Sequence, residues 1–163
     1  MKGISSHEFG TSQDVTRAQI VTIIYRMAGE PRIAYSGVFK DVPKGKWYTN
    51  AIEWATAKGI VNGISGHCFA PDDPLTRQQL CCVFARYYQM LGNGNRRIDP
   101  SLTLSFPDAG AVSGYAVTAV RWTVESALIN GITDSSGKVM LCPNGNTTRA
   151  QIAAIIMRFE RNT

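Results

Sequence analysis

The sequence predicts a mainly α-helical protein made of tandem helix–loop–helix repeats. The chain has 163 residues and matches itself, because Thr16-Arg17 recurs as Thr76-Arg77 and again as Thr148-Arg149. Each of these pairs opens a segment with apolar residues at helical spacing, which favours a helix over a strand. Such internal repetition is typical of arrays whose units bury their apolar faces against one another. Hydrophobic residues at 44% and charged residues at 18% are typical of a folded chain rather than a disordered one.

Alignment of the three copies divides the chain into repeats and linkers. We expect the second half of a first repeat at residues 1–30 and two complete repeats at residues 38–91 and 105–161. The linkers between them are expected at residues 31–37 and 92–104. The first repeat begins inside its turn, so we expect residues upstream of Gly3 to supply its first helix. The third repeat carries four extra residues near Asp134 to Met140, and an insertion confined to one stretch indicates a loop.

The first helix of a repeat is expected from about Trp47 to Lys58 in the second repeat. Its apolar positions are Trp47, Ala51 and Trp54, and they recur in the third repeat as Tyr115, Ala119 and Trp122. This amphipathic face predicts packing against the second helix of the same repeat. Trp54 and Trp122 are expected in the core, since aromatic residues on such a face are mostly buried.

The second helix is expected from about Arg77 to Leu91 in the second repeat. In each copy a threonine precedes a glutamine by three positions, a spacing that predicts a capping box; the pairs are Thr16 and Gln19, Thr76 and Gln79, Thr148 and Gln151. Gly29 and Gly92 are expected to end the first two of these helices. Each helix is too short to be stable alone, so we expect the three apolar stripes to meet around a common axis.

Composition narrows the class of function. The 17 Lys and Arg against 12 Asp and Glu give a net charge of +5, which favours an anionic partner. No apolar stretch approaches the roughly 18 residues that a membrane span needs. The basic residues are scattered, and His67, Cys68, Cys81 and Cys82 match no common zinc spacing. We therefore expect no enzyme activity, cofactor, metal site, nucleic-acid partner or membrane insertion, and leave the oligomeric state open.

An arginine stands at the first helical position of all three second helices: Arg17, Arg77 and Arg149. A cation is unfavourable at that end of a helix, where the peptide dipole prefers an acid. A guanidinium beside the N–H groups of a helix end forms an anion site that matches a carboxylate bidentately. One reading is therefore ligand binding, and the other is pairing with an internal acid such as Asp41, Asp108 or Glu53.

The repeats resemble the S-layer homology (SLH) motif. The residues that carry the resemblance are Phe39-x-Asp41-Val42, Trp47, Ala51-Ile52, Gly59-Ile60, Gly63, Phe69-x-Pro71 and Leu75-Thr76-Arg77, with their counterparts in the third repeat. The resemblance implies a pseudo-threefold, three-pronged bundle at the cell surface, within a longer secreted bacterial protein. It also implies non-covalent anchoring through an anionic, pyruvylated secondary cell-wall polysaccharide held in grooves between repeats. The alternative is a structural or protein-interaction array without affinity for carbohydrate.

Further ligand-binding candidates occupy equivalent positions in the second and third repeats: Asp41 and Asp108, Trp47 and Tyr115, Gly63 and Gly131. The aspartates suit either a loop or cap role or, by the resemblance, acceptance of sugar hydroxyls. Trp47 and Tyr115 suit either the core or a groove wall that faces a sugar ring. The glycines indicate positive φ, close approach of a ligand, or a helix end. The sequence departs from the family pattern at Gln78, where alanine is usual, and at the capping glutamines, where glutamate is usual.

Overall fold

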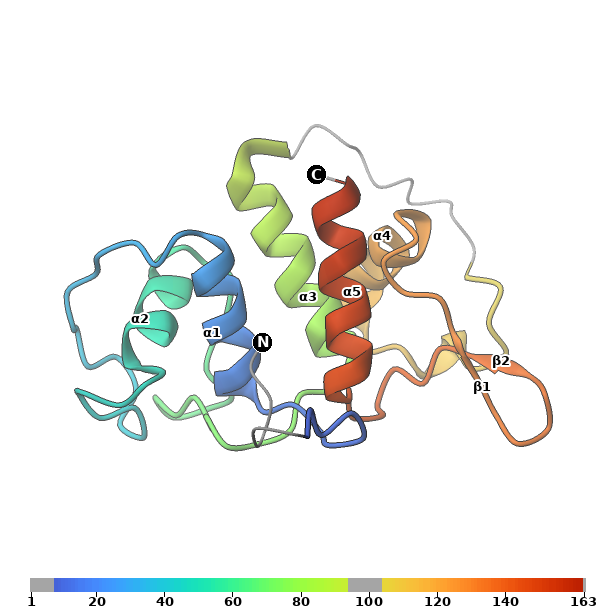
Figure 1. Ribbon diagram of the computed structural model, residues 1–163, viewed down its shortest axis with the longest axis horizontal. Helices are drawn as coiled ribbons and strands as arrows, with labels where there is room; N and C mark the ends of the chain where they lie inside the picture. Colours follow the sequence, from blue (N-terminus) through green and yellow to red (C-terminus); the bar gives the residue numbers. More distant parts are fainter. Residues whose placement is uncertain (1–7, 94–103, 163) are drawn as a thin grey trace. The chain divides into compact units, whose positions relative to one another are not determined.

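A computed structural model describes residues 8–93 and 104–162 and is mainly helical (Figure 1). The helices are α1 Arg17–Met27, α2 Thr49–Ala57, α3 Arg77–Tyr88, α4 Val117–Glu125 and α5 Arg149–Asn162. Shorter helical turns are Gln89–Asn93, Ala109–Ala111 and Gly114–Ala116, and two antiparallel strands are β1 Ile132–Thr133 and β2 Val139–Met140. The expected start of the first repeat before residue 8 and most of the linker at 92–104 lie outside the described residues. The predicted helical fold class is confirmed.

The second helices begin at the predicted capping boxes. In α1 the Thr16 side chain accepts from the Gln19 N–H, and the Gln19 side chain accepts from the Thr16 N–H. The same reciprocal pair opens α3 and α5. Local sequence alone fixes these helix starts, because both partners lie within three residues of each other.

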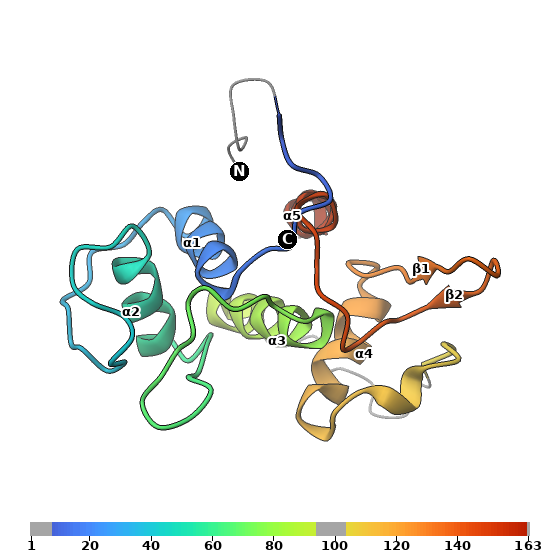
Figure 2. The same ribbon diagram turned by 90° about the horizontal axis from the view of Figure 1, so that it is seen from below.

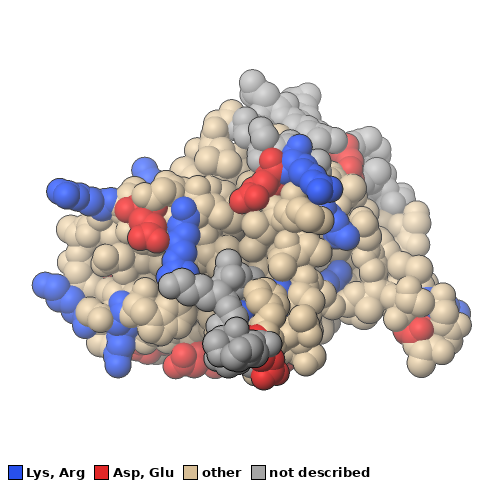
Figure 3. Space-filling view, viewed as in Figure 1, with Lys and Arg blue, Asp and Glu red and all other residues tan. Residues whose placement is uncertain are grey.

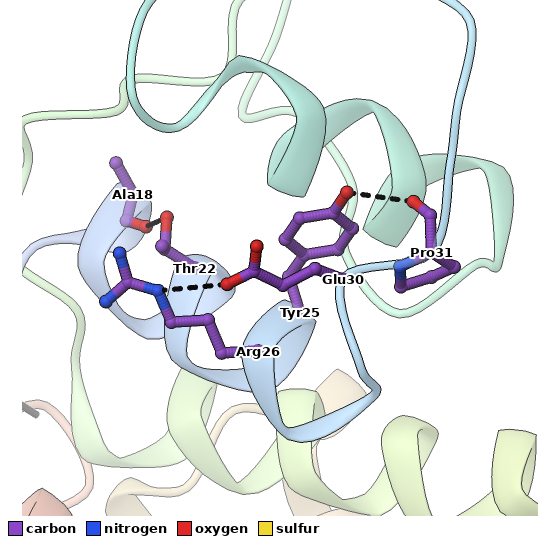
Figure 4. A network of polar contacts seen from close by, with 6 residues as sticks. All are labelled: Ala18, Thr22, Tyr25, Arg26, Glu30 and Pro31. Carbon is purple, nitrogen blue, oxygen red and sulfur yellow. Dashed lines mark hydrogen bonds and ion pairs between the residues drawn. The ribbon is translucent and has the colours of Figure 1, made fainter.

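A left-handed glycine follows α1, and a second one interrupts the helical turn Gln89–Asn93 that continues α3, at the positions where the sequence predicted the helices to end. Gly29 has φ +82° and Gly92 has φ +81°, a conformation that residues with a side chain adopt only with strain. Beyond α1, the Arg26 side chain pairs with Glu30 at 3.5 Å, and the Tyr25 hydroxyl donates to the Pro31 carbonyl at 2.8 Å (Figure 4). These contacts hold the chain as it leaves the helix.

The chain divides into two compact units, and the first comprises residues 15–75. In it α1 and α2 lie side by side and share a core (Figures 1 and 2). The ring of Trp54 on α2 packs against that of Tyr25 on α1, with 5.5 Å between centroids. The expectation that a first helix packs on the second helix of its own repeat is wrong, because α2 belongs to the second repeat and α1 to the first.

Hydrogen bonds at the N-terminus of α1 explain this pairing. The N–H groups of Arg17 and Ala18 donate to the carbonyls of Asp73 and Pro71, both at 2.9 Å. The turn of the second repeat is thereby fixed to the start of α1. The polypeptide between α2 and that turn is short, so α2 packs against α1. The apolar stripe of α2 could pack against many helices, and the bonds of the turn select α1.

Among the described residues, the second unit comprises residues 76–93 and 104–162 together with residues 8–14. Here α4 of the third repeat packs along α3 of the second (Figure 2). The Thr123 hydroxyl on α4 lies 3.2 Å from the Cys81 sulfur on α3. Helix α5 joins the unit through Phe159, whose ring lies 5.3 Å from that of Phe84. The pattern of the first unit therefore recurs. The pseudo-threefold, three-pronged arrangement of the repeats stays a prediction.

The insertion in the third repeat forms a hairpin. Strands β1 and β2 pair with Ile132 opposite Met140, and the Asp134 carboxylate accepts from the Ser136 and Lys138 N–H groups in the turn. After Phe69 and Leu141 the main chain turns through a left-handed residue, since Ala70 has φ +57° and Cys142 has φ +52°. Hydrogen bonds from the Ala70 N–H to Asp41 and from the Cys142 N–H to Asp108 hold these residues in this conformation.

Candidate functional site

The three cap-adjacent arginines are buried, each with at most 9% of its surface exposed. In each, Nε donates to a main-chain carbonyl. The pairs are Arg17 with Phe69 at 2.8 Å, Arg77 with Leu141 at 2.9 Å and Arg149 with Phe9 at 2.8 Å. The three carbonyls occupy equivalent positions in the turns of three repeats. An arginine on one repeat's second helix therefore binds the turn of another repeat within the same compact unit.

Two of these guanidinium groups also lie over aromatic rings. The central carbon of Arg17 is 4.6 Å from the centroid of Phe69, and that of Arg149 is 4.8 Å from the centroid of Phe9. In the third turn Leu141 replaces the aromatic residue. A cation over a ring face is attracted to it, so Phe69 and Phe9 bind the arginine both through the carbonyl and through the side chain.

Asp41 and Asp108 accept hydrogen bonds from the main chain of the same turns. The Asp41 carboxylate accepts from the N–H groups of Phe69 and Ala70 at 2.8 and 2.7 Å. Asp108 likewise accepts from Leu141 and Cys142 at 2.8 and 2.7 Å. Burial alone would raise the pKa of Asp41, but the N–H donors and the nearby Arg17 charge bring that pKa below its usual value.

Arginine and aspartate thus converge on one peptide segment in each unit. In the first unit Phe69 gives its N–H to Asp41 and receives the Arg17 Nε–H at its carbonyl. In the second unit Leu141 does the same with Asp108 and Arg77. Asp41, Asp108 and Glu53 were the acids considered as internal partners of the arginines. Asp41 and Asp108 accept from main-chain N–H groups, and Glu53 accepts from the Ser36 hydroxyl and the Gly37 N–H.

Gly63 and Gly131 lie against the same turns, and the reason for glycine is contact rather than conformation. Neither has positive φ. A Cβ on Gly63 would lie 2.6 Å from the Cys68 carbonyl oxygen and 2.7 Å from the Phe39 ring. A Cβ on Gly131 would lie 2.7 Å from the Phe106 ring. Positive φ therefore does not explain these glycines. A side chain is excluded at both positions because it would collide with neighbouring atoms of the protein.

Trp47 and Tyr115 differ from the other aromatic residues of the first helices. Their side chains are 60% and 62% exposed, and they occupy equivalent positions just before α2 and α4. Trp54 and Trp122 are buried, as predicted. Lys44 and Lys46, near Trp47 in sequence, are also exposed. Figure 3 shows basic side chains in several separate places on one face, with acidic ones between them.

Gln78 is a positioning residue to which sequence reasoning assigned no role. Its side chain is buried on α3, where its amide oxygen accepts from the Ser113 N–H at 2.9 Å and its amide nitrogen donates to Asn144 at 2.6 Å. It therefore joins two loops of the third repeat, one of which leads directly to Tyr115. Its departure from alanine, the residue at the equivalent Ala18 and Ala150, was the signal that could have identified it.

The cysteines have a packing role where they are most buried. Burial raises the pKa of Cys81 to about 12, so this thiol stays protonated at neutral pH. Over residues 8–93 and 104–162, no three His, Cys, Asp or Glu side chains gather as they would around a metal ion.

Comparison with known proteins agrees with the arrangement of repeated turns and helices. The family model described as "S-layer homology domain" matches residues 38–81 and 105–153, more than half of the chain. The chain belongs to the S-layer homology domain family. Within this SLH family the modules anchor proteins at the bacterial cell surface, which places the chain there. Both matched segments begin just before the phenylalanine of the Phe-x-Asp pattern.

Individual relatives are much longer proteins. The chain is 33% identical to an amylopullulanase of Thermoanaerobacterium thermosulfurigenes over 96% of its own length and 8% of that protein. It is 28% identical to the surface-layer 125 kDa protein of Lysinibacillus sphaericus, over 99% of the chain and 13% of the relative. It is 24% identical to a cellulosome-anchoring protein of Acetivibrio thermocellus, over 97% of the chain and 34% of the relative. The SLH module is an anchoring module, and the enzyme names belong to proteins that extend far beyond it.

No helix within residues 8–93 and 104–162 combines the length and the apolar character needed to cross a bilayer.

Proposed function

We propose that this SLH module anchors a larger protein by non-covalent binding to an anionic, pyruvylated secondary cell-wall polysaccharide. The polymer would bind where the second helix of one repeat meets the turn of the next. The residues that we assign to it are Arg17, Arg77, Arg149, Asp41, Asp108, Trp47, Tyr115, Gly63 and Gly131. The observation that carries the proposal is the exposure of an aromatic side chain at the same position of two repeats, 60% for Trp47 and 62% for Tyr115.

The exposure of these two aromatic rings to solvent calls for an explanation. Trp54 and Trp122 show that the first helices bury aromatic residues when packing requires it. Trp47 and Tyr115 stay at the surface, where a flat apolar face with a polar edge suits a sugar ring. The repetition of this exposure in two independent copies favours a shared ligand.

The charge of the module supports an anionic ligand. The chain carries a net charge of +5, and a positive field raises the local concentration of an acidic polymer. Arg77 uses Nε for the Leu141 carbonyl, so a ligand carboxylate would bind through the terminal nitrogens. Asp41 and Asp108 hold the turn to which the arginines bind, which gives them a positioning role toward the ligand.

A second candidate function is an interaction array without affinity for carbohydrate. The observation that favours it is the engagement of the arginines and aspartates with main-chain groups of the protein itself. In that case the three arginines stabilise the fold and the exposed aromatic residues meet another protein.

Sedimentation with purified cell wall distinguishes the two functions. We expect the chain to pellet with wall that retains its secondary polysaccharide, and to stay in solution after that polymer is extracted. Selective chemical removal of pyruvate should weaken pelleting strongly. Trp47→Ala and Tyr115→Ala should each weaken binding by roughly 3- to 10-fold, a loss of about 0.7–1.4 kcal/mol.

Matched controls are available in both units. Val38 and Val139 are exposed apolar residues, 43% and 49%, and Val38→Ala and Val139→Ala should leave wall binding unchanged. All four variants should unfold at the temperature of the parent chain within about 2 °C, because exposed side chains contribute little to stability. Equal binding to intact and extracted walls would overturn the proposal and favour a protein or peptidoglycan partner.

A further inference from the structure

The loops that carry the two exposed aromatic residues differ in charge. In the first unit Lys44 and Lys46 precede Trp47, and both lysines are exposed. In the part of the chain that the structure describes, neither lysine forms an ion pair. The loop and helix around Tyr115, residues 109–120, contain no Lys, Arg, Asp or Glu. The positions equivalent to the two lysines are Val112 and Gly114.

The lysine loop is fixed at both ends by one hydroxyl group. The Thr49 hydroxyl accepts from the Lys46 N–H at 3.0 Å and donates to the Pro43 carbonyl at 2.7 Å. Gly45, between the lysines, has φ +88°, which lets the chain turn there. Consecutive Cα atoms are about 3.8 Å apart, so those of both lysines lie within about 11 Å of the Cα of Trp47. Either lysine side chain is therefore long enough to reach a ligand that lies on the ring.

A neighbouring ring supports Trp47. The Trp47 and Tyr48 rings meet edge-on, with 5.1 Å between their centroids and 78° between their planes, and Tyr48 is buried. The third repeat has Ala116 in place of Tyr48. The first unit thus presents a braced aromatic ring together with two cations.

The turn of the first unit carries the opposite charge. Asp72 and Asp73 are exposed there, and the third repeat has Asn144 and Gly145 in their places. Burial, and then the negative charge of Asp72, raises the pKa of Tyr48, so this acid lies near the buried ring. A ligand carboxylate is therefore directed toward the lysines and away from the turn.

The arginines do not account for a difference between the two units. Arg17 and Arg77 occupy equivalent positions, both are buried, and each donates through Nε to a carbonyl of a turn. What they contribute to ligand binding, they contribute in both units. The unequal charge comes from the loops and turns.

We propose that the surface formed by Trp47, Lys44 and Lys46 is the principal binding site of the module for the acidic substituent of the polymer. The surface around Tyr115 then binds mainly uncharged parts of the same polymer. This assignment rests on the proposed function of polysaccharide anchoring. Its physical basis is that two ammonium groups attract a carboxylate over a screening length of about 8 Å, whereas an uncharged loop does not.

Pelleting with purified cell wall tests the assignment through a variant that combines Lys44→Ala with Lys46→Ala. On wall that retains its pyruvate we expect binding to weaken by roughly 3- to 10-fold, because each exposed ion pair is weak by itself. On wall from which pyruvate has been removed, this variant and the parent should bind alike. The loss on pyruvylated wall should also shrink at about 1 M salt, where the screening length is about 3 Å.

A charge-matched control separates local from overall attraction. Lys58→Ala combined with Lys138→Ala removes the same number of positive charges at exposed lysines distant in sequence from both aromatic residues. This control should change binding to pyruvylated wall by less than about 2-fold. Tyr115→Ala should weaken binding by a similar factor on both kinds of wall, whereas Trp47→Ala should weaken it more on pyruvylated wall.

The outcomes distinguish this assignment from the proposed function. Equal losses in the two lysine variants would overturn the assignment and leave polysaccharide anchoring intact, because overall charge would then explain them. An unchanged affinity of the Lys44 and Lys46 variant for pyruvylated wall would also overturn it. If the parent chain pelleted equally with intact and polymer-extracted wall, the proposed function would fail and the assignment with it.

Discussion

Asp41 shows how one side chain fixes a turn that lacks regular secondary structure. Its carboxylate accepts two main-chain N–H groups, at Phe69 and Ala70, and so holds Ala70 at a φ of +57°. The same peptide segment receives Arg17 from the other side. The aspartate of the Phe-x-Asp pattern therefore connects the loop before α2 to the turn after it.

Asp41→Ala should lower the free energy of unfolding by about 1–3 kcal/mol, because it leaves two main-chain donors without a charged acceptor. The measurement is urea unfolding followed by circular dichroism. Asp72→Ala, at an exposed residue of the same turn, is the control and should change stability by less than about 0.5 kcal/mol. Equal losses in the two variants would contradict this role for Asp41.

The same carboxylate predicts a dependence of stability on pH. The pKa of Asp41 is lower in the folded protein than its usual value near 3.9. Its contribution is therefore complete above about pH 5 and is lost as the pH falls through the folded pKa, below the usual value. Asp41→Asn should show a smaller loss of stability than the parent between about pH 5 and pH 2. Parallel curves for the two proteins would argue against it.

Gly63→Ala should destabilise the first unit by about 1–3 kcal/mol, since the new methyl group would overlap the Phe39 ring and the Cys68 carbonyl. Thermal unfolding by calorimetry measures the loss. Gly110→Ala is the matched control, because its Cβ meets nothing within 4 Å and its φ is not positive. A neutral Gly63→Ala would mean that the Phe39 side chain moves aside freely.

At the scale of elements, the sequence predicted those features that depend on contacts between residues close together in the chain. The capping boxes and the glycine stops of α1 and α3 were correct, because their partners lie a few residues apart. The partner of the first helix was wrong, since an apolar stripe with Ala51 and Trp54 fits any second helix equally well. The choice depends on the distant bond from Ala18 to Pro71, which no local pattern shows. The reading of Gly63 as a residue with positive φ was wrong for the same reason, because the neighbours that exclude a side chain there come from residue 39 and residue 68.

Gln78→Ala should loosen the loop that leads to Tyr115. The Gln78 side chain ties the Ser113 N–H to Asn144, and the variant restores the alanine found at Ala18 and Ala150. We expect a loss of about 1 kcal/mol and faster amide hydrogen exchange at residues 111–116. Gln89→Ala, at an exposed glutamine beyond the end of α3, is the control. Unchanged exchange at residues 111–116 would show that the loop holds itself.

At the scale of the whole molecule, two copies of the proposed aromatic contact predict multivalent binding to a polymer. Trp47→Ala combined with Tyr115→Ala should weaken wall binding by more than either single change, because the second contact on one chain forms at a high effective concentration. Pelleting against a series of wall concentrations measures this. A double variant no weaker than the Trp47→Ala variant would mean that only the second repeat binds.

Because α1 pairs with α2, the boundaries of the packing unit differ from those of the repeated sequence motif. Residues 15–75 form a compact unit closed by the bond from the Leu75 N–H to the Val15 carbonyl, at 3.1 Å. A fragment cut at the linkers would separate each helix from its neighbour, whereas one cut at Val15 and Leu75 keeps α1 and α2 together. Duplication or exchange of segments between proteins of this kind would preserve folding only when the crossovers fall inside the turns, half a motif away from the boundaries that sequence similarity marks.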